Sequence, residues 1–135
     1  MRPPPVIVAG VSDSVTALRV GAYACGLALR QRARLVVVHA RTIPAAACLV
    51  PDPLGDLWTG GDPCAEVAEV AHRLGLPTEV RTAWGTPADV LTRVAAETRA
   101  DAVVVGASTG RTRRLRPSVG VRLVRCGRWP VMVVP

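Results

Sequence analysis

Short runs of valine and other apolar residues recur along this chain, and they constrain its fold more than any other feature. Strands of a sheet with one face in water alternate between apolar and polar residues, whereas strands buried on both faces are apolar throughout. The unbroken runs therefore predict a parallel sheet that is covered by helices on both faces. The expected strands are residues 6–9, 35–40, 79–84, 102–106 and 131–134.

Segments with the 3.6-residue period of amphipathic helices separate the expected strands. These helices are expected at residues 14–32, at residues 63–75, from Thr86 onward, and at about 118–128. Thr86 can cap the third helix, because Pro87 follows it at the first helical position. In the first two helices the expected buried positions are Leu18, Ala22, Cys25 and Leu29, and then Val67, Val70, Ala71 and Leu74.

The alternation of strands and helices predicts the fold class. Right-handed crossovers would give an α/β fold, a three-layer, doubly wound, Rossmann-like sheet of five parallel strands. A chain of 135 residues is expected to form one domain over residues 1–135. Ligands of such sheets bind beyond the carboxyl ends of the strands, where the strand order reverses. The candidate binding residues there are Ala9, Gly10, Val11, Asp13, Val38, Ala40, Gly106, Thr109, Gly110, Arg111, Ser118, Val119 and Gly120.

The segment after the fourth expected strand is the most informative for function. Gly106 ends that strand, Gly110 follows in a loop, and a helix that starts near Ser118 would present free backbone N–H groups. A glycine loop and a helix N-terminus together predict an anion-binding cradle. The alternative is that the two glycines only form a turn.

Positive charge is concentrated in the same segment. The chain has a formal net charge of +7, and residues 107–135 hold seven arginines and no acidic residue. This distribution predicts attraction of an anionic small molecule, although an arginine-rich loop can also be a solvated surface. Nucleic acid is not the expected partner, because no aromatic residues are interleaved with the arginines to stack on bases.

Sequence signatures of enzymes and metal sites are missing. There is no GxSxG, no GxxxxGK[ST] and no pair of catalytic carboxylates, so we expect no enzymatic activity. His39 and His72 have no nucleophile or metal partner nearby in the sequence and are expected to be structural. Cys25 and Cys126 fall within helical apolar patterns, which predicts buried, reduced thiols and no metal site.

Two further features bear on location and on the site. The N-terminal segment lacks the apolar run of a signal peptide, and no segment reaches the roughly 20 apolar residues of a spanning helix, which predicts a cytoplasmic protein without membrane contact. Residues 41–60 are rich in Pro, Gly and Ala and have no period. A loop of this length often covers a binding site.

Four stretches of the chain resemble the universal stress protein (UspA) family, of the actinobacterial kind. They are VIVA at 6–9, RLVVVHA at 34–40, GTPADVL at 85–91, and AVVVG at 102–106 together with WPVMVVP at 129–135. The resemblance implies the adenine nucleotide α-hydrolase-like form of the sheet and a homodimer through the last strand, Val131–Val134. In one branch of the family it also implies ATP bound between the first and fourth strand ends.

The motif of the ATP-binding branch is eroded in this chain. That branch has Gly-x2-Gly-x9-Gly-Ser/Thr after the fourth strand and an Asp just after the first. Gly106 matches the first glycine, but Thr109 and Pro117 occupy the places of the other two, and Val11 occupies the place of the acid, with Asp13 close by. Threonine and proline replace such glycines poorly, because they restrict the backbone and proline removes an N–H donor.

We therefore expect a non-enzymatic, stress-response regulatory protein that binds ATP weakly or not at all. One alternative is an adenine-nucleotide binder in which arginines such as Arg111 take the place of the missing backbone amides. Another is a re-purposed small-molecule binder or enzyme. The dimer expectation has an independent basis, because the apolar last strand would leave an exposed edge in a monomer.

Overall fold

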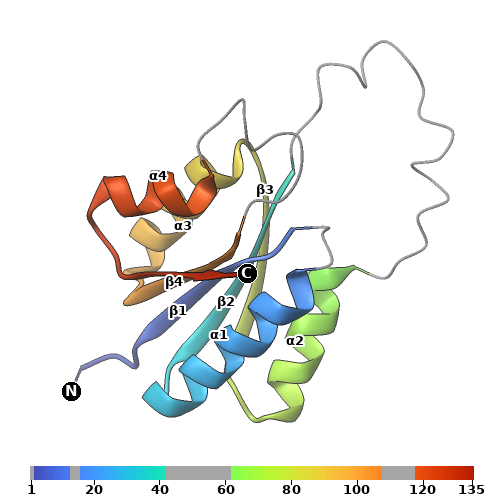
Figure 1. Cartoon of the computed structure of the whole chain (residues 1–135). Coiled ribbons are helices and arrows are strands. Elements are labelled where there is room, and N and C mark those ends of the chain that lie inside the picture. Colours follow the sequence, from blue (N-terminus) through green and yellow to red (C-terminus); the bar gives the residue numbers. More distant parts are fainter. Residues whose placement is uncertain (1, 13–15, 42–61, 108–117) are drawn as a thin grey trace, which may run out of the picture.

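Five parallel strands form one sheet in the order β3-β2-β1-β4-β5 (Figure 1). The computed structural model describes residues 2–12, 16–41, 62–107 and 118–135. Every expected strand is present and lies within one residue of its expected ends, so the doubly wound parallel sheet is confirmed. The strands are β1 (Val6–Gly10), β2 (Arg34–Arg41), β3 (Thr78–Trp84), β4 (Ala102–Gly106) and β5 (Val131–Val134).

Helices cover the sheet on both faces (Figure 1). On one side lie α1 (Ala17–Gln31) and α2 (Pro63–Arg73), and on the other lie α3 (Pro87–Thr98) and α4 (Val119–Cys126). Because β1 is flanked by β2 and β4, the chain winds in opposite directions from the centre of the sheet. The point where the strand order reverses therefore lies between β1 and β4.

Alternate residues of each central strand enter different hydrophobic clusters. In β1, Ile7 and Ala9 pack with α1 and α2, whereas Val6 and Val8 pack with α3. Residues 6–9 are all buried, since each of them faces one of the two helical layers. Burial on both sides is thus the physical reason for the unbroken apolar runs.

The buried face of α1 is not the one that its apolar period predicted. Leu18, Ala22 and Leu29 are exposed, and of the expected positions Cys25 alone is buried. The helix instead turns small residues toward the sheet and α2, which lets it approach closely. These buried residues are Ala17, Val20, Gly21, Ala24, Cys25 and Ala28.

Two smaller expectations about buried positions are also wrong. In α2, Val67 and Ala71 are buried as expected, but Val70 and Leu74 are 45% and 47% exposed. Val70 lies beside the buried stripe of the helix, and Leu74 lies past its last residue, at the C-cap. Cys126 is exposed, although it follows the buried residue 123 by three positions, and it is the last residue of α4. Cys25 is buried as expected, and burial raises the pKa of its thiol.

The start of α3 follows its sequence signal. Thr86 is the N-cap, and its Oγ1 accepts a hydrogen bond from the Asp89 backbone N–H at 3.3 Å, with Pro87 in the first turn. Asp62 caps α2 in a similar way by accepting from the Cys64 N–H at 3.0 Å. Among the described helices, none is long and apolar enough to span a membrane.

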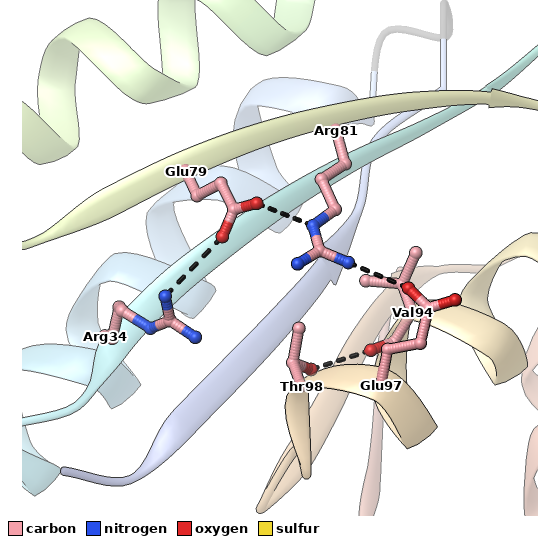
Figure 2. Close-up of polar contacts among 6 residues, drawn as sticks. All are labelled: Arg34, Glu79, Arg81, Val94, Glu97 and Thr98. Carbon is pink, nitrogen blue, oxygen red and sulfur yellow. Dashed lines mark hydrogen bonds and ion pairs between the residues drawn. The ribbon is translucent and has the colours of Figure 1, made fainter. Parts of the chain in front are cut away.

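A chain of ion pairs ties the edge strand β3 to its neighbours (Figure 2). Glu79 contacts Arg34 of β2 at 3.5 Å and accepts from Nε of Arg81 at 2.6 Å, and Arg81 Nη1 reaches Glu97 of α3 at 3.0 Å. The hydrogen bond to Glu79 is the main reason that the pKa of Arg81 is raised. The side chains of these ion pairs are a third or more exposed, so the pairs contribute little to the free energy of unfolding. They keep the edge of the sheet charged.

Two glycines of α1 provide a matched test of its close packing. A Cβ on Gly21 would lie 2.5 Å from Cγ2 of Val67, whereas one on Gly26 would meet only Arg30 Nη1 at 3.7 Å. We predict that Gly21→Ala lowers the free energy of unfolding by about 1–3 kcal/mol, because Val67 is branched and cannot move aside cheaply. Gly26→Ala should raise it by about 0.5–1 kcal/mol through helix propensity. Urea unfolding of both variants measures this, and equal effects would contradict the packing described.

Candidate functional site

The candidate site lies at the carboxyl edge of the sheet, where β1, β2 and β4 end. Gly10 pairs in register with Val38 of β2, and the ladder continues with the Val11 N–H donating to the Val38 carbonyl at 2.9 Å. The end of β4 lies on the other side of β1, with Ala9 paired to Val104. The structure thus brings together the expected residues that end these three strands.

Several of these residues are closed to a ligand. Ala9, Val11 and Val38 are at most 3% exposed as whole residues, because they belong to the two hydrophobic clusters. Gly10, Ala40 and Gly106 are half-buried. A ligand at the ends of β1, β2 and β4 would therefore contact these half-buried residues.

The histidine at the end of β2 contacts the backbone of the neighbouring strand. His39 Nδ1 lies 3.2 Å from the carbonyl oxygen of Val11. A carbonyl can only accept, so this contact requires that Nδ1 carries the proton and donates it. His39 thereby links β2 to the segment after β1, as expected of a structural residue, while His72 is exposed on α2, away from this edge.

Three glycines of the candidate site lie where a side chain would meet another part of the protein. A Cβ on Gly10 would lie 2.8 Å from Leu91 Cδ1 of α3, and one on Gly120 would lie 2.8 Å from Val133 Cγ2 of β5. At Gly106 the added atom would be 3.1 Å from Thr16 Oγ1, just before α1. Each glycine therefore lets a helix or its cap approach a strand, which favours the structural interpretation of these residues over direct contact with phosphate.

The backbone conformation of these glycines agrees with a packing role. The glycines with positive φ in the described part of the chain are Gly75, Gly85 and Gly127. None of the three belongs to the candidate site. At Gly10, Gly106 and Gly120 the space around the residue therefore favours glycine, and a left-handed backbone does not.

The N-terminus of α4 provides the positive end of a helix at this edge. Ser118 is the N-cap, and its Oγ accepts a hydrogen bond from the Val121 N–H at 3.2 Å. The N–H groups of Val119 and Gly120 belong to the first turn, where a helix has no backbone acceptors of its own. Free N–H groups at the start of a helix are the kind of group that binds anions, whereas the nearby Arg122 is paired with Asp89 at 3.4 Å.

Four of the expected site residues lie outside the described residues, namely Asp13, Thr109, Gly110 and Arg111. Nearly all of the expected loop at 41–60 lies outside them too. Within the described ranges, no group of three or more His, Cys, Asp or Glu side chains could hold a metal ion.

Two surface features near this edge had no clear sequence signal. One is an apolar hollow between α4 and β5, lined by Ser118, Gly120, Val121, Val124, Arg125 and Val133. The other is Trp84 at the end of β3, which is 62% exposed. The valines of α4 and the tryptophan are apolar residues in periodic segments, so the sequence alone would assign them to the core.

The packing role of Gly120 can be tested by rescue. We predict that Gly120→Ala lowers the free energy of unfolding by about 1–3 kcal/mol, because the new methyl group would overlap Val133. Val133→Ala removes the overlapping atoms, so the double variant should recover most of this stability. Chemical denaturation of the wild type, both single variants and the double variant measures the coupling. A Gly120→Ala variant as stable as the wild type would contradict the packing role.

Comparisons with known proteins give a consistent result. The model of the universal stress protein family matches residues 5–135. A search of curated proteins gave no match. A solved structure of a universal stress protein in complex with cAMP is 26% identical, with a TM-score of 0.73, and the match covers 96% of this chain and 95% of that one.

Two more solved structures show the same similarity. A protein of the universal stress protein family from Burkholderia pseudomallei is 25% identical, with a TM-score of 0.72 and coverage of 98% and 96%. The universal stress protein from Archaeoglobus fulgidus in complex with dAMP is 22% identical, with a TM-score of 0.69 and full coverage of both chains, and supports the fold alone. The narrower expectation of an actinobacterial type stays a prediction. The family match spans nearly the whole sequence, and the chain belongs to the universal stress protein family.

Proposed function

We propose that this protein is a non-enzymatic regulatory protein of the stress response whose adenine-nucleotide site is kept in place but binds ATP weakly. The observation that carries the proposal is the packing around Gly10, Gly106 and Gly120. Their missing side chains make room for Leu91, Thr16 and Val133, and not for a ligand. The cAMP-bound neighbour supports an adenine nucleotide as the ligand class.

The proposed site keeps some anion-binding groups and lacks others. The N–H groups of the first turn of α4 and the positive end of its dipole remain. The glycines expected by the ATP motif are Thr109 and Pro117 here, and proline has no N–H to donate. A charge-assisted hydrogen bond contributes roughly 1–3 kcal/mol, so the absence of two would move a micromolar site toward the millimolar range.

The nucleotide would lie across the carboxyl edge, with its phosphate at the start of α4. The half-buried Gly10 and Ala40 would line the rest of the site, next to the buried Val11 and Val38. Gly10 is paired with Val38 in the register of β1 with β2. The proposed site also includes Asp13, Thr109, Gly110 and Arg111. These four residues lie outside the described ranges and are proposed from the sequence alone.

Titration calorimetry with ATP tests the weak site. We predict a dissociation constant well above about 10 μM, because Thr109 and Pro117 cannot bring the backbone to the phosphate as two glycines would. A tighter constant would contradict the proposal.

A variant in which Arg111, Arg113, Arg114 and Arg116 are all glutamine serves as the comparison. It separates the weak site from the alternative in which arginines replace amides. If tight binding were found in the wild type and abolished in this variant, the alternative would be correct.

We further propose that two copies of the chain pair through β5. This strand lies at one edge of the sheet, and Val133 in it is 47% exposed. The neighbouring helix adds Val121 and Val124, which are 42% and 59% exposed and line the apolar hollow beside the strand. Pairing with a second copy would cover both the strand edge and this apolar surface, here called the β5–α4 face.

Val124→Asp tests this dimer, with Val70→Asp as the matched control. Both valines are exposed on helices, but Val70 lies on α2, on the opposite face of the sheet. We predict that light scattering gives twice the chain mass of 14.2 kDa for the wild type and for Val70→Asp, and one chain mass for Val124→Asp. The charge would be desolvated in the dimer and solvated in the monomer. A wild-type protein that is monomeric at micromolar concentration would contradict the proposal.

A further inference from the structure

Trp84 is the most exposed large apolar side chain in the described part of the chain, at 62%. It belongs to neither of the two hydrophobic clusters, although its neighbour Ala83 packs against the one on the α3 side. A single exposed apolar residue is common on protein surfaces. What sets Trp84 apart is where the strand places it.

The backbone around Trp84 is fixed on both sides. Trp84 pairs in register with Arg41, the last residue of β2, and the next N–H, that of Gly85, donates to the Arg41 carbonyl at 3.0 Å. Thr86 then caps α3 at once. Trp84 is therefore presented from an ordered strand end, which is how ligand-contacting residues are held in place. Because Ala83 packs on the α3 side, the alternation of the strand turns the indole to the α1–α2 face of the sheet. A nucleotide whose phosphate lies at the start of α4, on the α3 side, would meet this indole across the carboxyl edge.

The strand order places Trp84 on the side of the edge that a nucleobase would reach. The phosphate of a bound nucleotide would lie at the start of α4, beyond the end of β4. Neighbouring strands are about 4.8 Å apart, so β2 lies about 10 Å from β4, with β1 between them and β3 one strand further. The sugar separates the base of a nucleotide from its phosphate, so the base extends along the edge toward β2 and β3.

The register of β2 with β3 indicates which side chains the base would meet at this part of the edge. Arg41 and Trp84 are directly opposite each other and point to the same face of the sheet, as do His39 and Thr82 two pairs earlier. Arg41, Thr82 and Trp84 are all exposed. Among these residues the indole alone offers a wide aromatic surface.

We infer that Trp84 recognises the base of the bound nucleotide by stacking its indole on the purine ring. The inference rests on the proposed function, and it names the part of the ligand that this chain holds best. Stacking on an aromatic residue requires only the flat face of a base and no hydrogen-bond pattern. Base recognition of this kind compensates in part for the weak hold of the eroded motif on phosphate.

The experiment compares AMP with ribose 5-phosphate, which has the sugar and phosphate but no base. Binding to the wild type, Trp84→Leu, Trp84→Phe and Tyr23→Leu is followed by the chemical shifts of backbone amides. Tyr23 is 55% exposed on α1 and serves as the control for loss of an exposed aromatic ring. Circular dichroism confirms that each variant is folded.

We expect Trp84→Leu to weaken AMP binding about 5- to 100-fold, the range found for base–aromatic stacking, and to leave ribose 5-phosphate binding unchanged. Trp84→Phe should retain most of the affinity for AMP, and Tyr23→Leu should retain all of it. In the wild type, the indole N–H signal that is missing from Trp84→Leu should shift with AMP.

The outcomes separate this inference from the proposed function. If Trp84→Leu binds AMP as the wild type does, or loses AMP and ribose 5-phosphate equally, the role of Trp84 in base recognition is wrong and the nucleotide site stands. If the wild type shows no shifts with AMP at millimolar concentration, both the site and the role of Trp84 are wrong.

Discussion

The close approach of helices to the sheet is the constraint on which the rest of this structure depends. The core contains no phenylalanine and is filled by valine, alanine and leucine, so it can be tightly packed only if the layers lie near one another. Gly21 permits this approach between α1 and α2, and Gly10 and Gly120 permit it between the sheet and the helices on the other face. Glycine is used at these positions for its lack of a side chain.

The same constraint shapes the candidate site. A glycine at the end of a strand can let a phosphate approach the backbone, or it can let another part of the protein do so. In this chain Gly106 is approached by Thr16 and Gly120 by Val133. The fold of a nucleotide-binding family is thus retained for reasons internal to the protein, while its anion-binding motif can erode without loss of the sheet.

The fold could be predicted from the sequence because burial on both faces leaves a direct signature in each strand. Which face of a helix is buried was harder to predict. The stripe of Leu18 and Leu29 looked like a core face, but the neighbouring stripe of Ala and Gly is buried because it allows a closer approach. Periodicity counts apolar residues and does not measure the space available to them.

The candidate site was predictable only in outline. The strand ends named from the sequence do meet at one edge, because the carboxyl ends of parallel strands always do. The partners of the glycines and the exposure of Trp84 depend on long-range packing and on the edge position of β3. Neither can be read from a local pattern, since Leu91 and Val133 are distant in sequence from the glycines they contact.

Native mass spectrometry of the protein purified directly from cells reports whether the site retains a nucleotide. We predict a species of two chains, each of 14.2 kDa, with no nucleotide attached. A species that carries one adenine nucleotide per chain through purification would show that the site binds tightly. That result would contradict the claim that the glycines at the strand ends serve packing in place of phosphate binding.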